Sequence, residues 1–470
     1  MQVVRPLSQS EVERVHSASL DLLENVGLRI EHDELLRRLR AGGARVSEAN
    51  ANVRFPRSLM AELLARVPSS HTIHHPDGTR DVVKIGSRFL SGMVSEPKMI
   101  DYETGRPRPP QLADIRRNNI LCQKTAAVKN AYLMEVPILE DNFATPSLLS
   151  MEEYLVNNGK HIFHFGTSLE HLERYRTVTR IIAESQGIPA GGLVTVSCPV
   201  ISPLKVGQFH GECLLRCSEA GFAICGTMCS TAGATGPYSL AGNLVLANTE
   251  NLFVAAVTQI LKPGSAFLYM YSPSVLNMTD GSLKFYSMDK VLSKGATGQM
   301  AAFYNVPFML DGGGSMTCRF DVQSGVESFA SMLAAFSVNP SWIGGQGCFY
   351  NALGFSREMA VIHNAWFEVA KFLEQGIRID DERLAVESIQ RVGQGGDFLA
   401  DDLTVRMLRE GEFFGNDLFD LSGRETGKTM LDRAHEKVED LVAKFESPLP
   451  HGLQEKLRRY FHDARKKAER

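Results

Sequence analysis

The segment from residue 161 to residue 199 reads HIFHFGTSLEHLERYRTVTRIIAESQGIPAGGLVTVSCP. Two short runs of apolar and β-branched residues, HIFHFGT (161–167) and GLVTVSCP (192–199), enclose a longer stretch with apolar residues at helical spacing. A strand, a helix and a second strand in this order are typical of a βαβ unit, whose two strands lie parallel in one sheet. The segment therefore predicts an α/β protein built on parallel strands.

The same alternation of strand and helix continues along the middle of the chain. Five further runs predict strands, namely AYLMEVP (131–137), FAICGTM (222–228), AFLYMYS (266–272), PFMLDGG (307–313) and SWIGGQG (341–347). With seven strands visible, we expect an eighth around 95–120 or after 375. A closed (β/α)8 TIM barrel is favoured over an open doubly wound sheet. The open sheet would carry a G-x-G-x-x-G phosphate loop after its first strand, and none follows AYLMEVP.

The segments on either side of this repeat have other patterns. Residues 8–68 have helical spacing, whereas residues 70–110 alternate and contain Gly and Pro, which predicts short strands. The tail after residue 375 is charged and helical. We expect three parts, an N-terminal helical and β-rich extension (1–110), a barrel that forms the catalytic domain (111–390), and a C-terminal helical segment packed on the barrel (391–470).

Composition and charge exclude several classes of protein. The chain has 470 residues, 44% of them hydrophobic, and a formal net charge of −4, so nothing suggests nucleic acid or an anionic membrane as a partner. The start of the chain has no signal-peptide apolar core, and no apolar run is long enough to span a bilayer. We therefore expect a cytoplasmic protein whose eight cysteines are reduced.

Two cysteine pairs, Cys213/Cys217 and Cys225/Cys229, have a spacing of four residues. A metal site is conceivable there, but no C-x-x-C pair and no supporting histidine cluster is present. Cys213 and Cys217 lie in GECLLRCSEAG (211–221), an amphipathic pattern in which a small buried thiol fits well. We interpret the cysteines as structural and expect no metal.

The loops that follow barrel strands are the expected place for chemistry. Three of these loops are rich in aromatic residues and poor in charge, with Tyr269, Tyr271, Phe285, Tyr286, Phe349, Tyr350 and Phe355. Such rings suit a quaternary ammonium group, which is attracted to ring faces and has no N–H to donate. The alternative is that the rings belong to the core of the barrel and its loops.

Other residues after the strands have two interpretations each. His164 could be a base or a ligand, although a lone histidine in such a strand is more often a core residue. The run GGGS (312–315) could hold a phosphate, but no lysine follows it and such turns also permit close packing. Gln323 and Glu327 would share one helix face, with Asp321 as the N-cap of that helix. No nucleophile elbow, H-E-x-x-H motif or Walker loop occurs.

Several motifs in this order resemble the trimethylamine methyltransferase superfamily, most closely its branch without pyrrolysine, which includes glycine betaine–corrinoid methyltransferases. They are PVISPLKV (199–206), GATGPYSLAGNLVLANTE (233–250), MTDGSLKFYSMD (278–289), YNVPFMLDGGGSMTCRFDVQSGVES (304–328) and GGDFLADDLTVRMLREGEFFGNDLFD (395–420). The resemblance implies a (β/α)8 barrel that moves a methyl group from an amine to the Co(I) form of a corrinoid (cobalamin). A separate corrinoid-binding protein carries that acceptor, so the chain itself is expected to bind no cofactor tightly.

Departures from the family pattern argue against trimethylamine as the substrate. Trimethylamine enzymes carry pyrrolysine in the stretch matching residues 347–366, near Leu353–Gly354, where this chain has ordinary residues. Other family residues are replaced at His363, Ala365, Asp397 and Leu403. A quaternary ammonium already carries its charge and leaves as a neutral tertiary amine, so no general acid is needed. The site then has to exclude water and orient one N–CH3 bond.

The expected function is methyl transfer from a quaternary amine, glycine betaine first, to the corrinoid of a partner protein, giving dimethylglycine. Proline betaine, carnitine or γ-butyrobetaine as the substrate, a non-catalytic betaine-binding protein, and an unrelated barrel lyase or aldolase are the alternatives. The resemblance leaves a homo-oligomer open, and no residue is assigned as catalytic. The expected substrate-binding residues are His164, Tyr269, Tyr271, Asp311, Gln346, Phe349, Tyr350 and Asn351. The loop residues expected to face the corrinoid are Thr231, Thr235, Gly313, Gly314 and Ser315.

Overall fold

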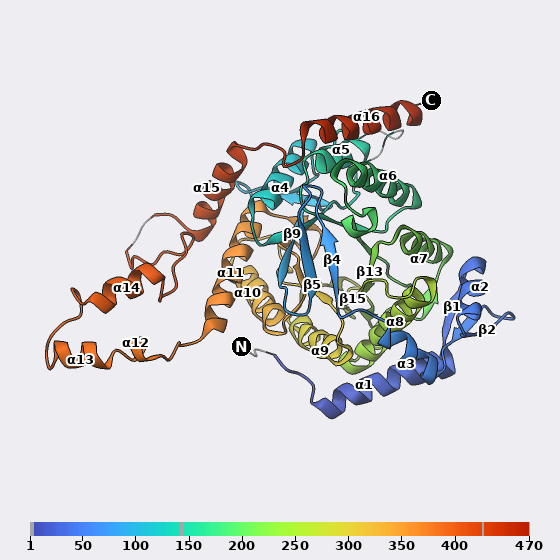
Figure 1. Ribbon diagram of the computed structural model, residues 1–470, viewed down its shortest axis with the longest axis horizontal. Coiled ribbons are helices and arrows are strands. Elements are labelled where there is room, and N and C mark those ends of the chain that lie inside the picture. The colour runs from blue at the N-terminus through green and yellow to red at the C-terminus, as the bar shows by residue number, and fades with distance from the viewer. Residues whose placement is uncertain (1–3, 142–144, 146, 425–426, 470) are drawn as a thin grey trace.

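Eight parallel strands form a closed barrel in the middle of the molecule, and helices surround it (Figure 1). The computed structural model describes residues 4–141, 145, 147–424 and 427–469. The barrel strands are β6 (Phe89–Met93), β9 (Val128–Tyr132), β10 (His161–Phe165), β11 (Val194–Ser197), β13 (Ala223–Met228), β15 (Phe267–Tyr271), β18 (Phe308–Asp311) and β19 (Trp342–Gly344). The predicted (β/α)8 barrel is confirmed.

All seven strands predicted from the sequence are barrel strands, but the place expected for the eighth is wrong. The eighth strand is β6, which lies upstream of the 95–120 segment and pairs with β19 on one side and β9 on the other. Its sequence is FLSGM, in which Ser91 and Gly92 interrupt the apolar run that would otherwise indicate a strand. Gly92 is needed there, since a Cβ would lie 2.5 Å from the Cys122 Sγ. The division at residue 111 stays a prediction, with one barrel strand on its N-terminal side.

A helix follows each barrel strand. These helices are α4 (Leu112–Lys124), α5 (Leu148–Val156), α6 (Leu169–Gln186), α7 (Gln208–Ala220), α8 (Leu240–Leu261), α9 (Asp289–Tyr304), α10 (Val322–Ser337) and α11 (Arg357–Gln375). The loops between strand ends and helix starts form one face of the barrel, called the rim below.

Helix α8 corrects the expectation that no apolar run could span a bilayer. Among the described residues it is the one helix whose length and composition pass that test. However, 83% of its apolar window is buried inside the protein. Its apolar residues therefore form part of the core between the barrel and the N-terminal helices. The cytoplasmic location stays a prediction.

The N-terminal extension is helical and β-rich, as expected. Helices α1 (Gln9–Asp21), α2 (Asp33–Ala41) and α3 (Arg57–Ala65) pack against α8, and α1 begins with a capping box between Ser8 and Glu11. The hairpin of β4 (Ser70–His74) and β5 (Arg80–Lys84) places Ile73 and Val83 in the same apolar cluster as the barrel interior.

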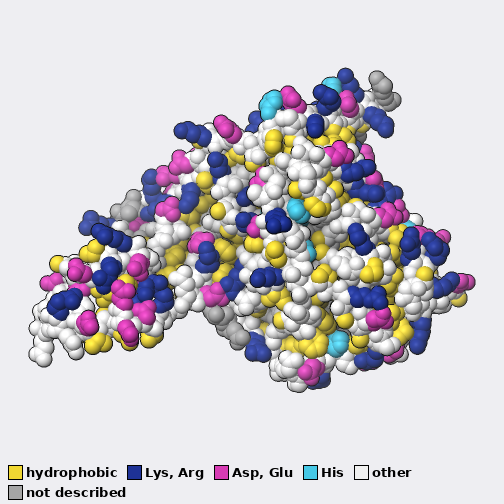
Figure 2. All heavy atoms as spheres, in the orientation of Figure 1, with side chains coloured by type: hydrophobic (Ala, Val, Ile, Leu, Met, Phe, Trp, Pro, Cys, Tyr) yellow, Lys and Arg dark blue, Asp and Glu magenta, His cyan; other side chains and the backbone are white. Residues whose placement is uncertain are grey.

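The C-terminal segment is only partly packed on the barrel. Helix α15 (Met430–Ala443) lies against α11 and α4, and α16 (His451–Ala468) lies against α5 and α6. By contrast, α12 (Asp381–Leu384), α13 (Val386–Val392) and α14 (Asp402–Glu410) project from the barrel as an arm (Figure 1). Charged side chains of both signs cover this arm in Figure 2. The segment after this arm returns to the barrel helices, because Leu418 is buried in the main core and Phe414 packs on Phe372 of α11. The boundary at residue 391 stays a prediction.

Short strands form two additional small sheets at the rim. A four-stranded sheet has the order β20 (Cys348–Phe349), β21 (Gly354–Phe355), β7 (Lys98–Ile100) and β8 (Pro107–Arg108). A three-stranded sheet contains β14 (Thr231–Ala232), β16 (Ser274–Leu276) and β17 (Leu283–Lys284). These sheets tie loops that follow different barrel strands to one another, so the rim is held as one structure.

Candidate functional site

Two lysines and one aspartate meet at the rim beside β18. Asp311 is the last residue of β18, and its Oδ2 accepts a hydrogen bond of 2.7 Å from the Ser272 Oγ. The Lys290 Nζ lies 3.0 Å from the same oxygen, and the Lys294 Nζ lies 4.0 Å from it. Both lysines belong to the first turns of α9, four residues apart, and so share one helix face. We call Ser272, Lys290, Lys294 and Asp311 the Asp311 cluster.

The Asp311 cluster is buried and contains two basic side chains and one acidic side chain. The side chains of Lys290 and Lys294 are 5% and 3% exposed. Burial lowers the pKa of both lysines, that of Lys294 to about 7. Burial also opposes ionisation of Asp311, but the two lysines outweigh it and lower the pKa of that carboxyl to about 2. Among the described residues, neither ammonium nitrogen has a hydrogen-bond acceptor in good geometry.

Aromatic rings and thiols adjoin this cluster. The Lys290 Nζ lies 3.1 Å from the ring centre of Phe285 and 4.9 Å from that of Tyr286, in the geometry of a cation–π contact. The Tyr286 hydroxyl donates to the Cys348 Sγ at 2.9 Å. Cys229, just after β13, is reached by water but enclosed enough that burial raises the pKa of its thiol to about 11. Both ring faces thus already attract an ammonium group.

Glu96 follows β6 on the same rim and is also buried. Burial raises the pKa of its carboxyl to about 8, so it is mostly protonated at neutral pH. The charge of Glu96 would act on Tyr132 and Cys348. At neutral pH, Asp311 is therefore the ionised carboxylate that faces the two lysines.

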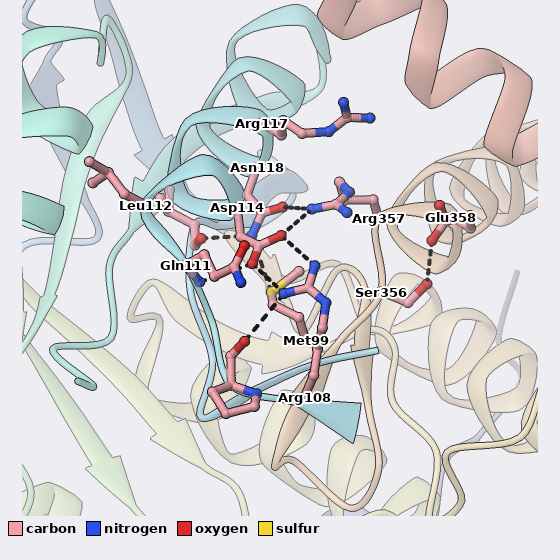
Figure 3. A network of polar contacts seen from close by, with 12 residues as sticks. Met99, Arg108, Gln111, Leu112, Asp114, Arg117, Asn118, Ser356, Arg357 and Glu358 are labelled. Atoms are coloured by element: carbon pink, nitrogen blue, oxygen red, sulfur yellow. Dashed lines mark hydrogen bonds and ion pairs between the residues drawn. The ribbon is translucent and has the colours of Figure 1, made fainter. Parts of the chain in front are cut away.

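A second carboxylate on the rim is held very differently (Figure 3). Asp114, in the first turn of α4, receives two hydrogen bonds from the Arg108 guanidinium, at 2.6 and 2.8 Å. The Arg357 Nη1 donates to Asp114 at 3.0 Å and to the Asn118 Oδ1 at 3.3 Å. The backbone N–H of Gln111 completes the set at 3.0 Å. We call this group the Asp114 network, and it joins β8 to the starts of α4 and α11.

Tyr269 and Tyr271 are not at the place expected for a substrate cage. Successive side chains of a strand point to opposite faces, and in β15 Leu268 and Met270 belong to the interior cluster. Tyr269 and Tyr271 therefore pack outward, between the barrel and its helices. The Tyr269 hydroxyl donates to the Asn248 Oδ1 of α8 at 3.0 Å. Their aromatic rings are part of the core, which was the alternative interpretation.

His164 also points outward from its strand. Its ring lies 4.3 Å from that of Tyr175 on α6, and its Nδ1 lies 3.3 Å from the Glu135 Oε1. Glu135 contacts the His171 Nδ1 at 2.7 Å as well. Burial lowers the pKa of His164 to about 3, so the ring is neutral. His164 is a core residue that supports α6, and it does not meet the Asp311 cluster.

The hairpin after β19 holds four of the expected residues. Phe349 is buried and stacks on Phe320 at 5.1 Å. Tyr350 and Asn351 have positive φ in the turn, and the Asn351 Oδ1 accepts from the Phe285 N–H at 2.8 Å. The Gln346 Nε2 donates to the Gly344 carbonyl at 3.2 Å. This hairpin thus supports the segment that carries Phe285. Leu353 is the last residue of its turn, and Gly354 begins β21.

The loops expected to face a corrinoid divide into two groups. Thr235 is exposed and Thr231 half-buried, in a loop where the Thr231 N–H donates to the Thr235 Oγ1 at 2.9 Å. Gly313, Gly314 and Ser315 are buried instead, and their facing a corrinoid stays a prediction.

Close packing explains the glycines of this loop. A Cβ on Gly313 would lie 2.4 Å from the His363 Nδ1, and one on Gly314 would lie 2.3 Å from the Tyr286 ring. The Ser315 Oγ donates to the Glu327 Oε2 at 2.9 Å. The run 312–315 therefore fits the packing interpretation given to it.

The prediction that Asp321 caps α10 is confirmed. Asp321 is the N-cap of α10, accepting from the Ser324 N–H at 3.1 Å, and the Gln323 Nε2 donates to the Glu327 Oε1 at 2.9 Å. All eight cysteines are free thiols, and six of them are buried, including both members of the Cys213/Cys217 pair. Within the described part of the chain, no group of three or more His, Cys, Asp or Glu side chains is arranged to hold a metal ion.

Sequence reasoning missed Lys290, Lys294 and Glu96. The expected site positions are those directly after predicted strands, whereas the lysines enter the rim from α9. A signal was present, because SMDKVLSKGATGQMAAFYN (287–305) places two lysines four apart on a helix otherwise rich in small and apolar residues. Glu96 was missed because β6 was not recognised. The expectation of a rim poor in charge is therefore wrong.

Comparison with known proteins assigns the family. The family model for trimethylamine methyltransferase matches residues 1–470. A trimethylamine methyltransferase of Methanosarcina mazei is 26% identical over 93% of this chain and 90% of its own length. A glycine betaine methyltransferase of Desulfitobacterium hafniense is 26% identical over 94% of this chain and 93% of its own length. The solved monomethylamine methyltransferase of Methanosarcina barkeri superposes with a TM-score of 0.48 and 13% identity, covering 94% of this chain and 96% of the other. The chain belongs to the trimethylamine methyltransferase family, and the prediction of a methyltransferase is confirmed.

Proposed function

We propose that this member of the trimethylamine methyltransferase family transfers a methyl group from a quaternary amine, glycine betaine first, to the Co(I) corrinoid of a separate small protein. The observation that carries the proposal is the hairpin around Leu353–Gly354. In the resemblance described above, this is where trimethylamine enzymes carry pyrrolysine. Here the turn holds ordinary side chains, and burial raises the pKa of the neighbouring Cys348 thiol, so it stays protonated. The hairpin thus offers no group to activate a tertiary amine.

A quaternary ammonium needs no such activation. The electron pair of Co(I) attacks the methyl carbon, a carbon–cobalt bond forms, and the N–CH3 bond breaks. The nitrogen keeps the bonding pair and leaves as a neutral tertiary amine, so no proton moves. The chain has to hold the ammonium, exclude water and point one methyl group at the acceptor. A rim whose carboxyl Glu96 is mostly protonated and whose thiols stay protonated at neutral pH suits this chemistry.

The surface of the rim supports docking of a protein that carries the acceptor. Large apolar side chains are exposed on several of its loops, namely Ile201, Tyr238, Leu240, Met278, Met288 and Leu353. Clusters of exposed apolar residues mark surfaces for protein partners. They lie on the face where the substrate would be held, as transfer to a carried corrinoid requires.

The test is a methyl-transfer assay with the whole chain. The protein is mixed with free cobalamin reduced to Co(I), or with a corrinoid protein, and with glycine betaine, and the visible spectrum is followed for methyl-Co(III). We expect methyl-Co(III) and dimethylglycine in equal amounts. A response to proline betaine, carnitine or γ-butyrobetaine alone would change the substrate. Binding of glycine betaine without transfer to any acceptor would favour a betaine-binding protein.

A pair of variants tests the docking surface. Tyr238→Asp should slow transfer to the corrinoid protein about tenfold, since a charge placed in an apolar interface is costly. Transfer to free cobalamin should not change. Phe413→Asp, at another exposed aromatic position, near the projecting arm, is the matched control. Equal rates for both variants with the corrinoid protein would contradict docking at the rim.

A further inference from the structure

The charges of the Asp311 cluster do not balance. When both lysines are protonated, they supply two positive charges, and Asp311 supplies one negative charge. The charged groups that act on Lys294 are Asp311, Lys290 and the Cys348 thiol. The other buried carboxyls nearby have their own partners or are neutral. Glu250 accepts from the Leu204 N–H at 2.9 Å and the Ser202 Oγ at 2.7 Å.

A buried cation without a counter-charge is expensive to maintain. The two ammonium groups are nearly enclosed, and both lack a hydrogen-bond acceptor in good geometry within the described ranges. They also sit in the first turns of α9, where the helix dipole adds positive potential. Three independent features of one place thus favour an anion, although the chain is acidic overall.

We propose that Lys290 and Lys294 bind a carboxylate of the substrate, so that the enzyme selects zwitterionic ammonium carboxylates over amines without an anionic group. The proposal rests on the proposed function for the identity of the bound molecule. The Asp311 carboxylate and Ser272 position Lys290, and Lys294 supplies the charge that Asp311 leaves unbalanced. The rings of Phe285 and Tyr286 lie beside this anion site and contact the Lys290 ammonium.

Lys294→Met tests this assignment without disturbing the closer ion pair. The variant keeps Lys290 and Asp311 together and removes only the unbalanced cation. Calorimetry with the whole chain would compare glycine betaine with choline, which has the same ammonium but a hydroxyl in place of the carboxylate. We expect the Kd of glycine betaine to rise at least tenfold and that of choline to stay within about twofold. Lys371→Met, at an exposed lysine of α11, is the matched control and should change neither.

Asp311→Asn gives a prediction of opposite sign. It removes the anion that competes for the lysines and keeps the side-chain shape. The Kd of glycine betaine should fall several-fold, whereas that of choline should not fall. The proposal would be overturned if the Kd values of glycine betaine and choline rose equally in Lys294→Met. It would also be overturned if glycine betaine bound more weakly to Asp311→Asn. Because the two variants differ in the sign of their effect, misfolding of one leaves the other decisive.

The methyl-transfer assay separates this proposal from the proposed function. Lysine-dependent binding of glycine betaine without methyl transfer would support the anion site and refute the reaction. Methyl transfer with the same ratio of KM values for glycine betaine and choline in the wild type and Lys294→Met would support the reaction and refute the anion site.

Discussion

The Asp114 network and the Asp311 cluster have the same formal composition, one aspartate with two basic residues, and both lie at the rim. In the Asp114 network, planar guanidinium groups donate to both carboxylate oxygens, and the second arginine has a further acceptor in Asn118. In the Asp311 cluster, two lysines approach one oxygen, at 3.0 and 4.0 Å, and their remaining N–H bonds have no acceptor in good geometry among the described residues. Completed hydrogen bonding in the Asp114 network is typical of a structural centre, whereas the incomplete bonding of the Asp311 cluster leaves N–H donors for the proposed anion.

Asp114→Asn should produce the largest effect, on stability alone. It leaves Arg108 and Arg357 without their anion, and breaking such a pair costs about 3 kcal/mol or more. Urea unfolding should show this loss in the free energy of unfolding, with the Kd of glycine betaine unchanged in the folded protein. Asp417→Asn, at an exposed aspartate paired with Lys437, should cost less than about 1 kcal/mol. Weaker binding of glycine betaine without any loss of stability would contradict a purely structural role for the Asp114 network.

Lys294→Met should have the opposite effect on stability. The pKa of Lys294 is lowered from 10.5 to about 7, so between these values the unfolded chain binds more protons than the folded one. Wild-type stability therefore rises with pH through this window, and the full cost of the buried charge is present below pH 7. We expect the variant to be more stable by about 2 kcal/mol at pH 6 and to lose this advantage toward pH 10. Urea unfolding at pH 6 and pH 9 measures the difference, and destabilisation at both values would contradict an unpaired cation.

Binding of glycine betaine should weaken as the pH rises. A carboxylate favours protonated Lys294, so above about pH 7 the Kd should rise roughly tenfold per unit. Asp311 stays ionised throughout, Cys348 stays a thiol, and burial lowers the pKa of Lys290 as well. Glu96, whose pKa burial raises to about 8, acts on Cys348 and not directly on Lys294. Calorimetry from pH 6 to 9 should show this slope in the wild type and a flatter one in Lys294→Met.

Arg357→Lys should have the smallest effect. It tests how much the planar geometry of the guanidinium, apart from its charge, contributes to the Asp114 network. A lysine keeps the charge near Asp114 but cannot reproduce the planar fork that reaches both Asp114 and Asn118. We expect a loss of about 1 kcal/mol in the free energy of unfolding, well below that of Asp114→Asn. A loss as large as that of Asp114→Asn would show that charge contributes less to the network than geometry does.

Much of the fold was predictable because barrel strands and helices are local patterns. Seven strands were placed within a few residues, and the capping of α10 by Asp321 followed from residue type and position. The strand β6 was not predictable in the same way, because its Ser91 and Gly92 suit contacts with distant segments. Because β6 was not predicted, Glu96, which follows it, was not predicted as a residue of the candidate site either.

The sequence by itself determined the barrel and the family, and it shows ordinary residues at the hairpin where the resemblance places pyrrolysine. Only the tertiary structure decided which side chains meet at the rim. The strands of a closed parallel barrel are buried on both faces, so their sequences do not show which face is interior, and Tyr269 and Asp311 could not be sorted by pattern. The decisive contacts also join separate elements, as Lys290 on α9 does with Asp311 on β18, and Asp114 with Arg357 across 243 positions of the chain. Charge balance is a property of such contacts, and it exists only once the chain has folded.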